Sequence, residues 1–436
     1  MKADRYKHIA LLFILIIVQM GLVKAQDKTQ SINLETVLQI GGANNLTIQE
    51  YKLRQALALA KHTKAKEWWL PDVYFGTSVH QLWGSAMNGD GRFFTEVNRQ
   101  NFWTGFGLNA SWNFGDAIFK EDAAELKTQA AVYTTEVEKN KALVEVVQTY
   151  YDFLTAQLHY NAYEALSLEA DTIARQIEIQ VQAGIRYTSD ALLAKSNYNH
   201  LRVEMLKAKT RYNNKSASLV RILNLDPNVK LVGMDSVLIP IELVSSESLR
   251  TPLESAYTSR PELQSMDLTL QSIHIEKKTT TTGLWLPELR VGTYGSYFGD
   301  VIQPLNPTSE VNVSLLWKIP LGRAVYGGDL KRFEMRIQLQ ENKISQTKSV
   351  VNEEVISSKL QITTAKEQLE IAKEGSELSG LALQQSMQRQ QLGTVRPFEI
   401  LQAQEIYIQS RLDYLNAVAS FNKAQYAYYV AIGNNL

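Results

Sequence analysis

The sequence predicts an α+β membrane protein in which long helical hairpins alternate with pairs of β-strands. Three observations lead to this fold class. The chain from Ala117 to Ala183 lacks proline and glycine, and its apolar residues recur at three- and four-residue steps, which is typical of a long helix. Other segments alternate apolar and polar residues with a period of two, which is typical of strands. The order of these patterns occurs twice, which predicts an internal duplication.

Composition excludes several classes of function. The 436 residues include 45 basic and 45 acidic side chains, and no segment gathers Lys and Arg into a block. Nucleic acid is therefore not an expected partner. The absence of cysteine excludes disulfides and thiolate metal sites. The six histidines are scattered, and no nucleotide-binding or nucleophile motif is present. We therefore expect no cofactor, no metal and no enzymatic activity.

The N-terminus has the features of a secretory signal peptide. Lys2, Arg5 and Lys7 precede an apolar run, and Val23-Lys24-Ala25 resembles a cleavage site. We expect residues 1–25 to be removed, with an uncleaved membrane anchor as the alternative. After this segment no apolar run reaches the length of a membrane-spanning helix. The mature chain is therefore expected to be exported.

The first half of the mature chain, residues 26–249, is predicted to begin with a helix and two strands. A helical pattern runs from Leu34 to Trp69, and a proline soon after it ends the helix. Strand patterns follow over 73–83 and 102–114. Between them, residues 84–99 are rich in Gly, Asn and charge, which predicts an exposed hairpin loop.

A helical hairpin completes this half. The long helix is predicted to begin after Asp116 and to end at Gly184. A short turn then leads to a second helix from Asp190 to about Asn224. Ser189 or Asp190 is expected to cap the second helix. The residues that follow are expected to be irregular.

The second half, residues 250–436, repeats this order. Leu286-Pro287-Glu288 precedes a strand pattern over 311–319, as Leu70-Pro71-Asp72 precedes the first strand. A second long helix is expected from about Asp329 to Leu392. A constant offset of 209 residues aligns identical residues around the two helical turns: Gly184 with Gly393, Leu192 with Leu401, Ala194 with Ala403, Tyr198 with Tyr407, Arg202 with Arg411 and Leu206 with Leu415. We interpret this agreement as a duplication, with chance similarity of amphipathic helices as the alternative.

One face of the predicted strands carries no charge. Its apolar side chains are expected to contact lipid: Phe102, Phe106, Leu108, Trp112 and Phe114 in the first half, and Val311, Val313, Leu315 and Trp317 in the second. The alternating residues are mostly small or polar and suit a lumen. Four strands cannot close a membrane barrel, so the barrel is expected to be shared, with eight strands from two chains or twelve from three. A soluble elongated protein with a small sandwich is the alternative.

The chain resembles the TolC-like outer-membrane efflux proteins. The resemblance covers about residues 32–433, and its carriers are the duplicated plan, Arg260-Pro261-Glu262-Leu263, the helix-to-strand Leu-Pro junctions and the two glycine turns. It implies a homotrimer with a twelve-stranded barrel in the outer membrane and a twelve-helix tunnel across the periplasm. It also implies a passive exit duct of a tripartite efflux or type I secretion system. The duct would dock a periplasmic adaptor protein bound to an inner-membrane pump. A soluble periplasmic coiled-coil scaffold is the alternative function.

The resemblance also places the adaptor contacts at the two helical turns. They are Gly184, Ile185, Arg186, Ser189 and Asp190 in the first hairpin, and Gly393, Thr394, Val395, Arg396 and Glu399 in the second. Both arginines could instead be solvated charges. Well-studied family members narrow the tunnel near its tips with acidic side chains, but no acid lies between Leu378 and Arg396 here. We therefore hypothesise a constriction of amides at Gln384 and Gln388, with a solvated helix face as the alternative.

Overall fold

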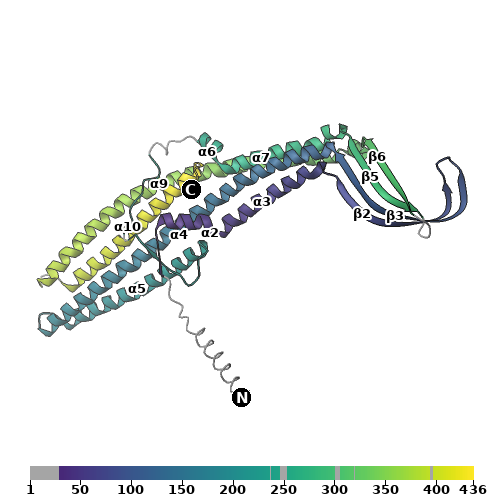
Figure 1. Cartoon of the computed structure of the whole chain (residues 1–436). Coiled ribbons are helices and arrows are strands. Elements are labelled where there is room, and N and C mark those ends of the chain that lie inside the picture. Colours follow the sequence, from purple (N-terminus) through teal and green to yellow (C-terminus); the bar gives the residue numbers. More distant parts are fainter. Residues whose placement is uncertain (1–28, 236, 246–252, 300–304, 319, 393–395) are drawn as a thin grey trace, which may run out of the picture. The chain divides into compact units, whose positions relative to one another are not determined.

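The computed structural model describes residues 29–235, 237–245, 253–299, 305–318, 320–392 and 396–436 (Figure 1). The predicted signal peptide, residues 1–25, lies outside these ranges. The described chain divides into two units. The helical unit comprises the described residues up to Glu50 with Glu136–Arg260 and Val350–Leu436, and the sheet unit comprises Tyr51–Thr135 and Pro261–Ser349.

The helical unit contains two helical hairpins, α4–α5 and α9–α10, and a small parallel sheet (Figure 1). Its elements are β1 Thr29–Ile32, α2 Leu34–Asn44, the later part of α4 Phe114–Gln182, α5 Thr188–Ile222, β4 Lys230–Gly233, α6 Leu253–Ser259, the later part of α9 Gly328–Gln391, and α10 Pro397–Ala431. The pair β1–β4 was not predicted, because four-residue strands are too short to display a period of two.

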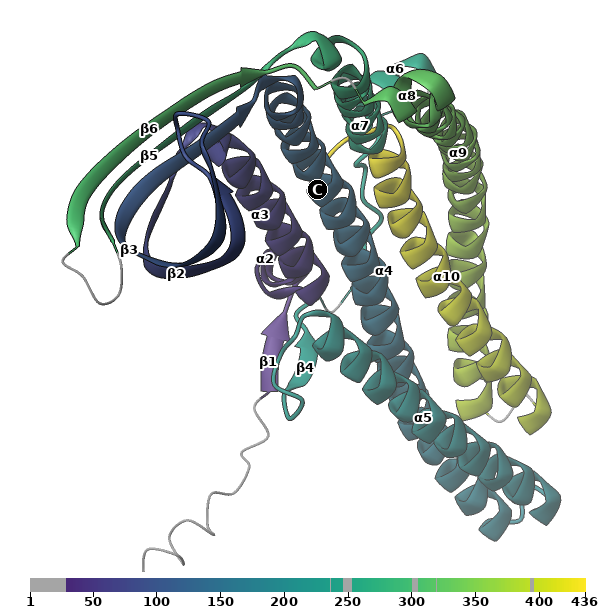
Figure 2. The same cartoon turned by 90° about the vertical axis from the view of Figure 1, so that its right-hand side faces the viewer.

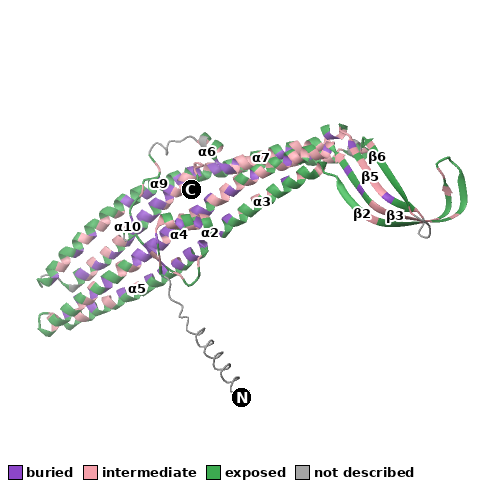
Figure 3. Ribbon diagram, viewed as in Figure 1, coloured by how far each residue is buried: buried purple, intermediate pink, exposed green. Residues whose placement is uncertain are grey.

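The core of the helical unit is formed by apolar faces of its long helices. Tyr150, Phe153 and Leu154 of α4 are fully buried, as are Leu219 of α5 and Tyr428 of α10. Burying each such side chain stabilises the unit by up to about 1.5–3 kcal/mol. Figure 3 shows buried positions along the long helices, whereas the strands of the sheet unit are mostly exposed or half-buried.

The sheet unit combines a four-stranded antiparallel sheet with helices. Its elements are most of α3 Leu46–Lys66, η1 Glu67–Trp69, β2 Asp72–Met87, β3 Phe93–Asn113, the first part of α4, α7 Pro261–Lys277, η3 Lys278–Thr280, η4 Thr282–Trp285, β5 Glu288–Gly299, β6 Asn306–Leu316, α8 Leu321–Tyr326 and the first part of α9. The strands follow the order β2-β3-β5-β6, which Figure 2 shows from the side. Within the described ranges, β2 and β6 each have a strand partner on one side only.

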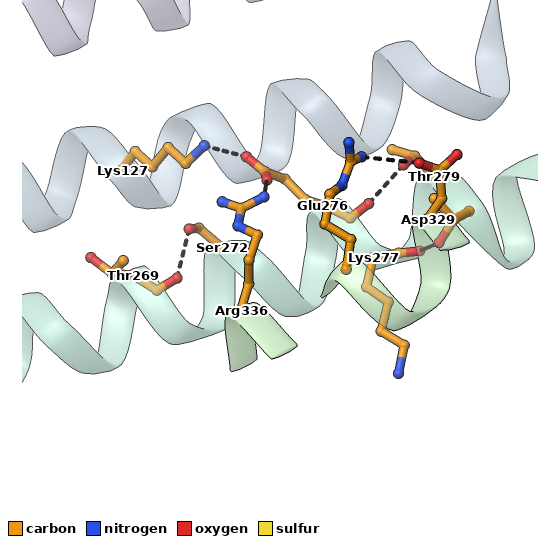
Figure 4. A network of polar contacts seen from close by, with 10 residues as sticks. Lys127, Thr269, Ser272, Glu276, Lys277, Thr279, Asp329 and Arg336 are labelled. Carbon is orange, nitrogen blue, oxygen red and sulfur yellow. Dashed lines mark hydrogen bonds and ion pairs between the residues drawn. The ribbon is translucent and has the colours of Figure 1, made fainter. Parts of the chain in front are cut away.

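An ion-pair network joins three helices of the sheet unit (Figure 4). Glu276 of α7 accepts a hydrogen bond from Arg336 Nη1 of α9 at 2.8 Å and pairs with Lys127 of α4. Burial opposes ionisation of this carboxyl, but the hydrogen bonds and charges of Lys127 and Arg336 outweigh it and lower the pKa of Glu276. The carboxylate therefore stays charged at neutral pH and links α4, α7 and α9.

The start of α4 lies against η4 without space for a side chain. A Cβ atom on Gly115 would lie 2.1 Å from the carbonyl oxygen of Gly283, and a Cβ atom on Gly283 would lie 2.2 Å from that of Gly115. Only glycine fits at either position. Phe114, predicted to end a strand, is instead the first residue of α4, and its ring packs edge-on against Trp68 with centroids 5.7 Å apart. That part of the strand prediction is wrong because the aromatic contact and the glycine contact favour the helix.

The predicted loop over 84–99 is wrong for most of its length, since β2 and β3 continue through it. The turn is confined to a few residues, where the Asn88 amide donates to the Arg92 carbonyl at 3.0 Å. Gly84 has a φ of 111°, and the register shifts between Gly84 and Ala86. A glycine that suggests a loop in the sequence therefore marks a bulge within a strand.

Most helix boundaries agree with the predictions. α9 confirms the second long helix to within one residue at each end. The predicted helix from Leu34 to Trp69 is divided at Asn45, whose Oδ1 accepts hydrogen bonds from the amides of Thr47 at 2.9 Å and Ile48 at 3.3 Å. This capping starts a new helix, α3. No helix within the described ranges is both long enough and apolar enough to cross a membrane.

Candidate functional site

The register of the sheet separates an apolar face from a polar face. Residues that lie directly opposite each other in antiparallel strands share a face. Phe75 is opposite Phe106, and Val291 is opposite Val313. We call their side the apolar face. Its larger side chains are Val73, Phe75 and Val79 of β2, Phe102, Phe106, Leu108 and Trp112 of β3, Leu289, Val291 and Tyr297 of β5, and Val311, Val313 and Leu315 of β6. Many are exposed, with Phe75 at 89%.

The opposite side, the polar face, is mostly small and hydrophilic. It includes Gly76 and Ser78 of β2, Gly105, Gly107, Asn109 and Ser111 of β3, Arg290, Gly292 and Ser296 of β5, and Thr308, Glu310, Asn312 and Ser314 of β6. It also has four aromatic residues, which differ from the mostly small or polar side chains expected on this face: Tyr74, Trp103, Tyr294 and Phe298.

The structure brings seven of the predicted lipid-contacting residues together on the apolar face. They are Phe102, Phe106, Leu108 and Trp112 of β3 and Val311, Val313 and Leu315 of β6. Trp317 follows the last residue of β6, and Phe114 belongs to α4. Trp112 Nε1 donates a hydrogen bond to the Trp69 carbonyl at 2.7 Å, which fixes this ring at the end of its strand.

The first helical turn is a Schellman motif. Gly184 has a φ of 74°, its amide donates to the Val181 carbonyl at 2.9 Å, and the Ile185 amide donates to the Gln180 carbonyl at 2.9 Å. The left-handed conformation explains why glycine stands here. It gives α4 a sharp end and leaves the following side chains on the outside of the turn, where Ile185 is 70% exposed and Tyr187 is 81% exposed.

Arg186 at this turn is not simply solvated. Its Nε donates to Gln180 Oε1 at 2.6 Å and its Nη2 donates to Gln390 Oε1 of α9 at 3.0 Å. The guanidinium therefore joins the two helical hairpins near their turns. The prediction that Ser189 or Asp190 caps α5 is wrong, since both lie inside its first turn. Ser189 is exposed and Asp190 is half-buried.

The second helical turn is described only in part. Gly393, Thr394 and Val395 lie outside the described residues. Arg396 is the exposed residue just before α10, and Glu399 in the first turn of α10 lies 3.7 Å from Arg389 of α9.

Large apolar side chains at both turns were missed in the sequence. Leu392 and Phe398 flank the second turn and are exposed, as Tyr187 is at the first. The helical pattern contained no signal for them, because exposure at a helix end depends on where the turn directs each residue.

The predicted constriction residues lie on the surface of α9. Gln384 and Gln388 are both exposed, whereas Gln390 is buried and bonded to Arg186. Gln404 of α10 is likewise buried and accepts a hydrogen bond from Asn197 of α5 at 3.0 Å. Buried amides therefore hold the two hairpins together, while the two exposed amides are available to solvent or to another chain.

The described residues contain no group of three or more His, Asp or Glu side chains arranged to hold a metal ion. Several of their titratable groups lie in structural contacts. Asp152 of α4, for example, accepts hydrogen bonds from Lys215 Nζ at 2.7 Å and from Lys423. Burial raises the pKa of Asp152, but the two lysines lower it further, so the net shift is downward.

His159 gives the helical unit a predictable response to acid. It is buried on α4, and its Nε2 has no hydrogen-bond partner among the described residues. Desolvation, and then the charge of Arg211, lowers its pKa from 6.5 to about 4. As the pH falls, the unfolded chain binds this proton at a higher pH than the folded chain does. The free energy of unfolding therefore decreases between pH values of about 6.5 and about 4. The slope from this group is at most about 1.4 kcal/mol per pH unit.

We expect His159→Gln to flatten this dependence. The measurement is the thermal unfolding midpoint of the detergent-extracted protein at several pH values between neutrality and a pH of about 4. The natural chain should lose more stability over this interval than the variant. Parallel curves for the two proteins would show that His159 is protonated equally in both states.

Comparison with known proteins is consistent with the geometry. Residues 37–225 match the model of a family described as outer membrane efflux protein. The fold is similar to that of the CmeC outer membrane channel of Campylobacter jejuni, with 16% identity, a TM-score of 0.76, and coverage of 92% of this chain and 85% of that one. It is also similar to a membrane protein from Pseudomonas aeruginosa, with 14% identity, a TM-score of 0.76, and coverage of 92% and 93%.

The open state of the MtrE outer membrane channel of Neisseria gonorrhoeae is a further similar structure, with 13% identity, a TM-score of 0.73, and coverage of 92% and 89%. No curated protein sequence matches this chain significantly. Residues 37–225 match the model of the outer membrane efflux protein family, so the predicted resemblance to that family is confirmed. The description of this family is that of an efflux protein. The family and the similar structures are described as outer-membrane or membrane proteins, which supports the predicted location in the outer membrane.

Proposed function

We propose that three copies of this chain assemble into a passive exit duct across the outer membrane. The observation that carries the proposal is a four-stranded sheet with an exposed apolar face, a polar face, and one unpaired edge each on β2 and β6. Unpaired edges are not tolerated in lipid, and four strands cannot close. Three copies would supply twelve strands, with the apolar face on lipid and the polar face around the lumen.

The helical unit also has a surface that suits neighbouring copies. A groove of about 690 Å³ lies between α9 and α10 and is lined by Ile356, Leu360 and Ala424 among others. Exposed apolar residues continue along α9: Ile371, Leu378 and Leu381. Large apolar surfaces on an exported protein favour contact with another chain. We infer that the helical hairpins of three copies pack side by side as a tunnel.

The two halves of the chain, residues 26–249 and 250–436, have the same order of helix, two strands and helical hairpin. This order supports the proposed duplication. It also supports a tunnel wall built from equivalent hairpins.

Envelope fractionation tests the assembly. We expect the full precursor, once expressed, to give an outer-membrane species whose detergent-extracted mass corresponds to three chains. A soluble periplasmic monomer would support the alternative function, a coiled-coil scaffold. It would contradict the shared barrel directly.

We propose further that the two helical turns dock a periplasmic adaptor protein, which links the duct to an inner-membrane pump. The pump supplies the energy for transport. The exposed Ile185 and Tyr187 at the first turn and Leu392 and Phe398 at the second support this proposal, because aromatic and aliphatic anchors dominate protein interfaces.

Replacing both aromatic anchors, with Tyr187→Ser and Phe398→Ser, is expected to abolish pump-dependent efflux. Each anchor contributes about 2 kcal/mol, which is about thirtyfold in affinity. The trimer should still form, because both side chains are exposed. Adaptor co-purification and efflux are measured against Val203→Ser, which changes an exposed apolar residue further along α5. Normal adaptor binding by the double variant would exclude the turns as the docking site.

We propose that Gln384 and Gln388 narrow the tunnel near its inner end. Both amides are exposed on α9, where three copies could bring them around one axis. Replacing both by alanine is then expected to raise the single-channel conductance in planar bilayers. Unchanged conductance would mean that they form a solvated helix face.

A further inference from the structure

Four aromatic side chains gather on the polar face of the sheet. One straight row across the four strands consists of Tyr74, Gly107, Tyr294 and Glu310. Two rows further along the same face, Trp103 lies opposite Phe298. Each strand therefore contributes to the group, which we call the aromatic patch: Tyr74, Trp103, Tyr294, Phe298 and Glu310.

The rings of the aromatic patch contact one another. The Trp103 centroid lies 6.4 Å from that of Tyr74 and 5.9 Å from that of Tyr294, the latter in an edge-to-face arrangement. The Tyr294 hydroxyl donates a hydrogen bond to the Glu310 carboxylate, which orients both groups. Between the tyrosines the strand has no side chain: a Cβ atom on Gly107 would lie 2.6 Å from the Tyr74 ring. The rings therefore lie low against a floor of backbone.

The charge within the rows of the aromatic patch is negative, and the basic Arg99 of β3 lies two rows beyond Trp103 on the same face. The four rows of the polar face from Asp72 to Ser78 contain two carboxylates, Asp72 and Glu310, and no basic residue. The nearest arginine on β5, Arg290, is already paired with Glu288, with Nε and Oε1 2.6 Å apart. Because aromatic faces attract cations, rings and carboxylates together select positive charge.

A buried hydroxyl in the same patch has no partner. Ser296 lies in the row between Tyr294 and Trp103, and its side chain is only 7% exposed. Its Oγ makes no hydrogen bond within the described part of the chain. A buried polar group without a partner is costly and usually marks an absent water or ligand.

We propose that the aromatic patch binds flat aromatic cations as they pass along the lumen. The proposal rests on the proposed function, because it needs the polar face to line the duct. The ligand ring would stack against Trp103 and the tyrosines, and its charge would be balanced by Glu310 and Asp72. A donor on the ligand, such as an aromatic amine, would reach Ser296 Oγ. The competing interpretation is that the rings only shield the glycine backbone.

Ethidium is a suitable probe, because it is a flat aromatic cation with amine donors and its fluorescence anisotropy rises on binding. Its dissociation constant is measured on the detergent-extracted full chain. We expect Trp103→Leu to weaken binding about tenfold, by loss of stacking and cation–π attraction. Glu310→Gln keeps the shape of its side chain, removes the charge, and should weaken binding severalfold. Pyrenesulfonate, a flat aromatic anion, should not bind.

Phe75→Leu is the matched control, since it removes an aromatic ring from the same sheet on the apolar face. Equal ethidium affinity for the natural chain, Trp103→Leu and Glu310→Gln would overturn the proposal and leave only the shielding role. The binding assay does not require conduction. A chain that conducts ions in bilayers but binds ethidium without regard to Trp103 would retain the proposed duct and lose the site. Residue-dependent binding by a chain that does not conduct would retain the site and contradict the duct.

Discussion

Gly115→Ala is expected to prevent stable folding of the sheet unit. Replacing a helical glycine by alanine normally stabilises a protein by up to about 1 kcal/mol. Here the added Cβ would lie 2.1 Å from the carbonyl oxygen of Gly283, which is a backbone atom and cannot rotate away as a side chain can. Overpacking a rigid contact costs about 1–3 kcal/mol in ordinary cores, and backbone against backbone should exceed that range. The start of α4 and η4 would have to separate.

The readout for Gly115→Ala is the thermal midpoint and yield of the detergent-extracted protein. Gly42→Ala is the control, because Gly42 lies in α2 and no atom beyond the adjacent residues and helix backbone lies within 4 Å of its Cβ position. It should be neutral or stabilising. Gly283→Ala should resemble Gly115→Ala, since the contact is reciprocal. A midpoint for Gly115→Ala at or above that of the natural chain would show that the two backbone segments can move apart at little cost.

Arg260→Leu is expected to destabilise the helical unit by about 1–3 kcal/mol. The side chain is only 6% exposed, and its Nε donates to the Ala431 carbonyl at 2.8 Å while Nη1 donates to Glu354 Oε2 at 2.5 Å. Ala431 is the last residue of α10, so the guanidinium also neutralises the negative end of that helix. Leucine would leave the carbonyl without this partner in a buried site.

Denaturant unfolding measures the effect of Arg260→Leu. Glu354→Gln provides the comparison, because Glu354 is about half exposed and its ion pair should contribute at most about 1 kcal/mol. A similar decrease in the free energy of unfolding in both variants would show that the ion pair, and not the buried hydrogen bond to Ala431, provides most of the stabilisation. This arginine was noted in the sequence only as part of a family motif, and the structure gives it a physical role.

The long helices could be predicted because their signal is local. From Ala117 to Ala183 nothing interrupts the helical pattern, and both helical hairpins follow from it. The alternation over 102–112 likewise predicted which residues share a face of the sheet. These features depend on the sequence near each residue. They do not depend on contacts with distant parts of the chain.

The remaining features depend on contacts between distant residues. Phe114 could not be assigned to α4 without its contact with Trp68, and Arg186 could not be linked to Gln390 of α9. Gly84 gives the same signal whether it starts a loop or marks a bulge. Only the partner strand distinguishes these cases, and a single sequence does not identify it.

The edges of β2 and β6 that have no strand partner among the described residues affect how the protein can assemble. The sheet of a single copy is stable neither in water nor in lipid. Its apolar face is costly to expose to water, and the backbone groups at its open edges are costly to expose to lipid. In the proposed assembly, insertion into the membrane and association of the copies must therefore be one coupled event. Its yield would rise steeply with the concentration of newly exported chains. A copy that cannot pair its edges would also disable every assembly that it enters.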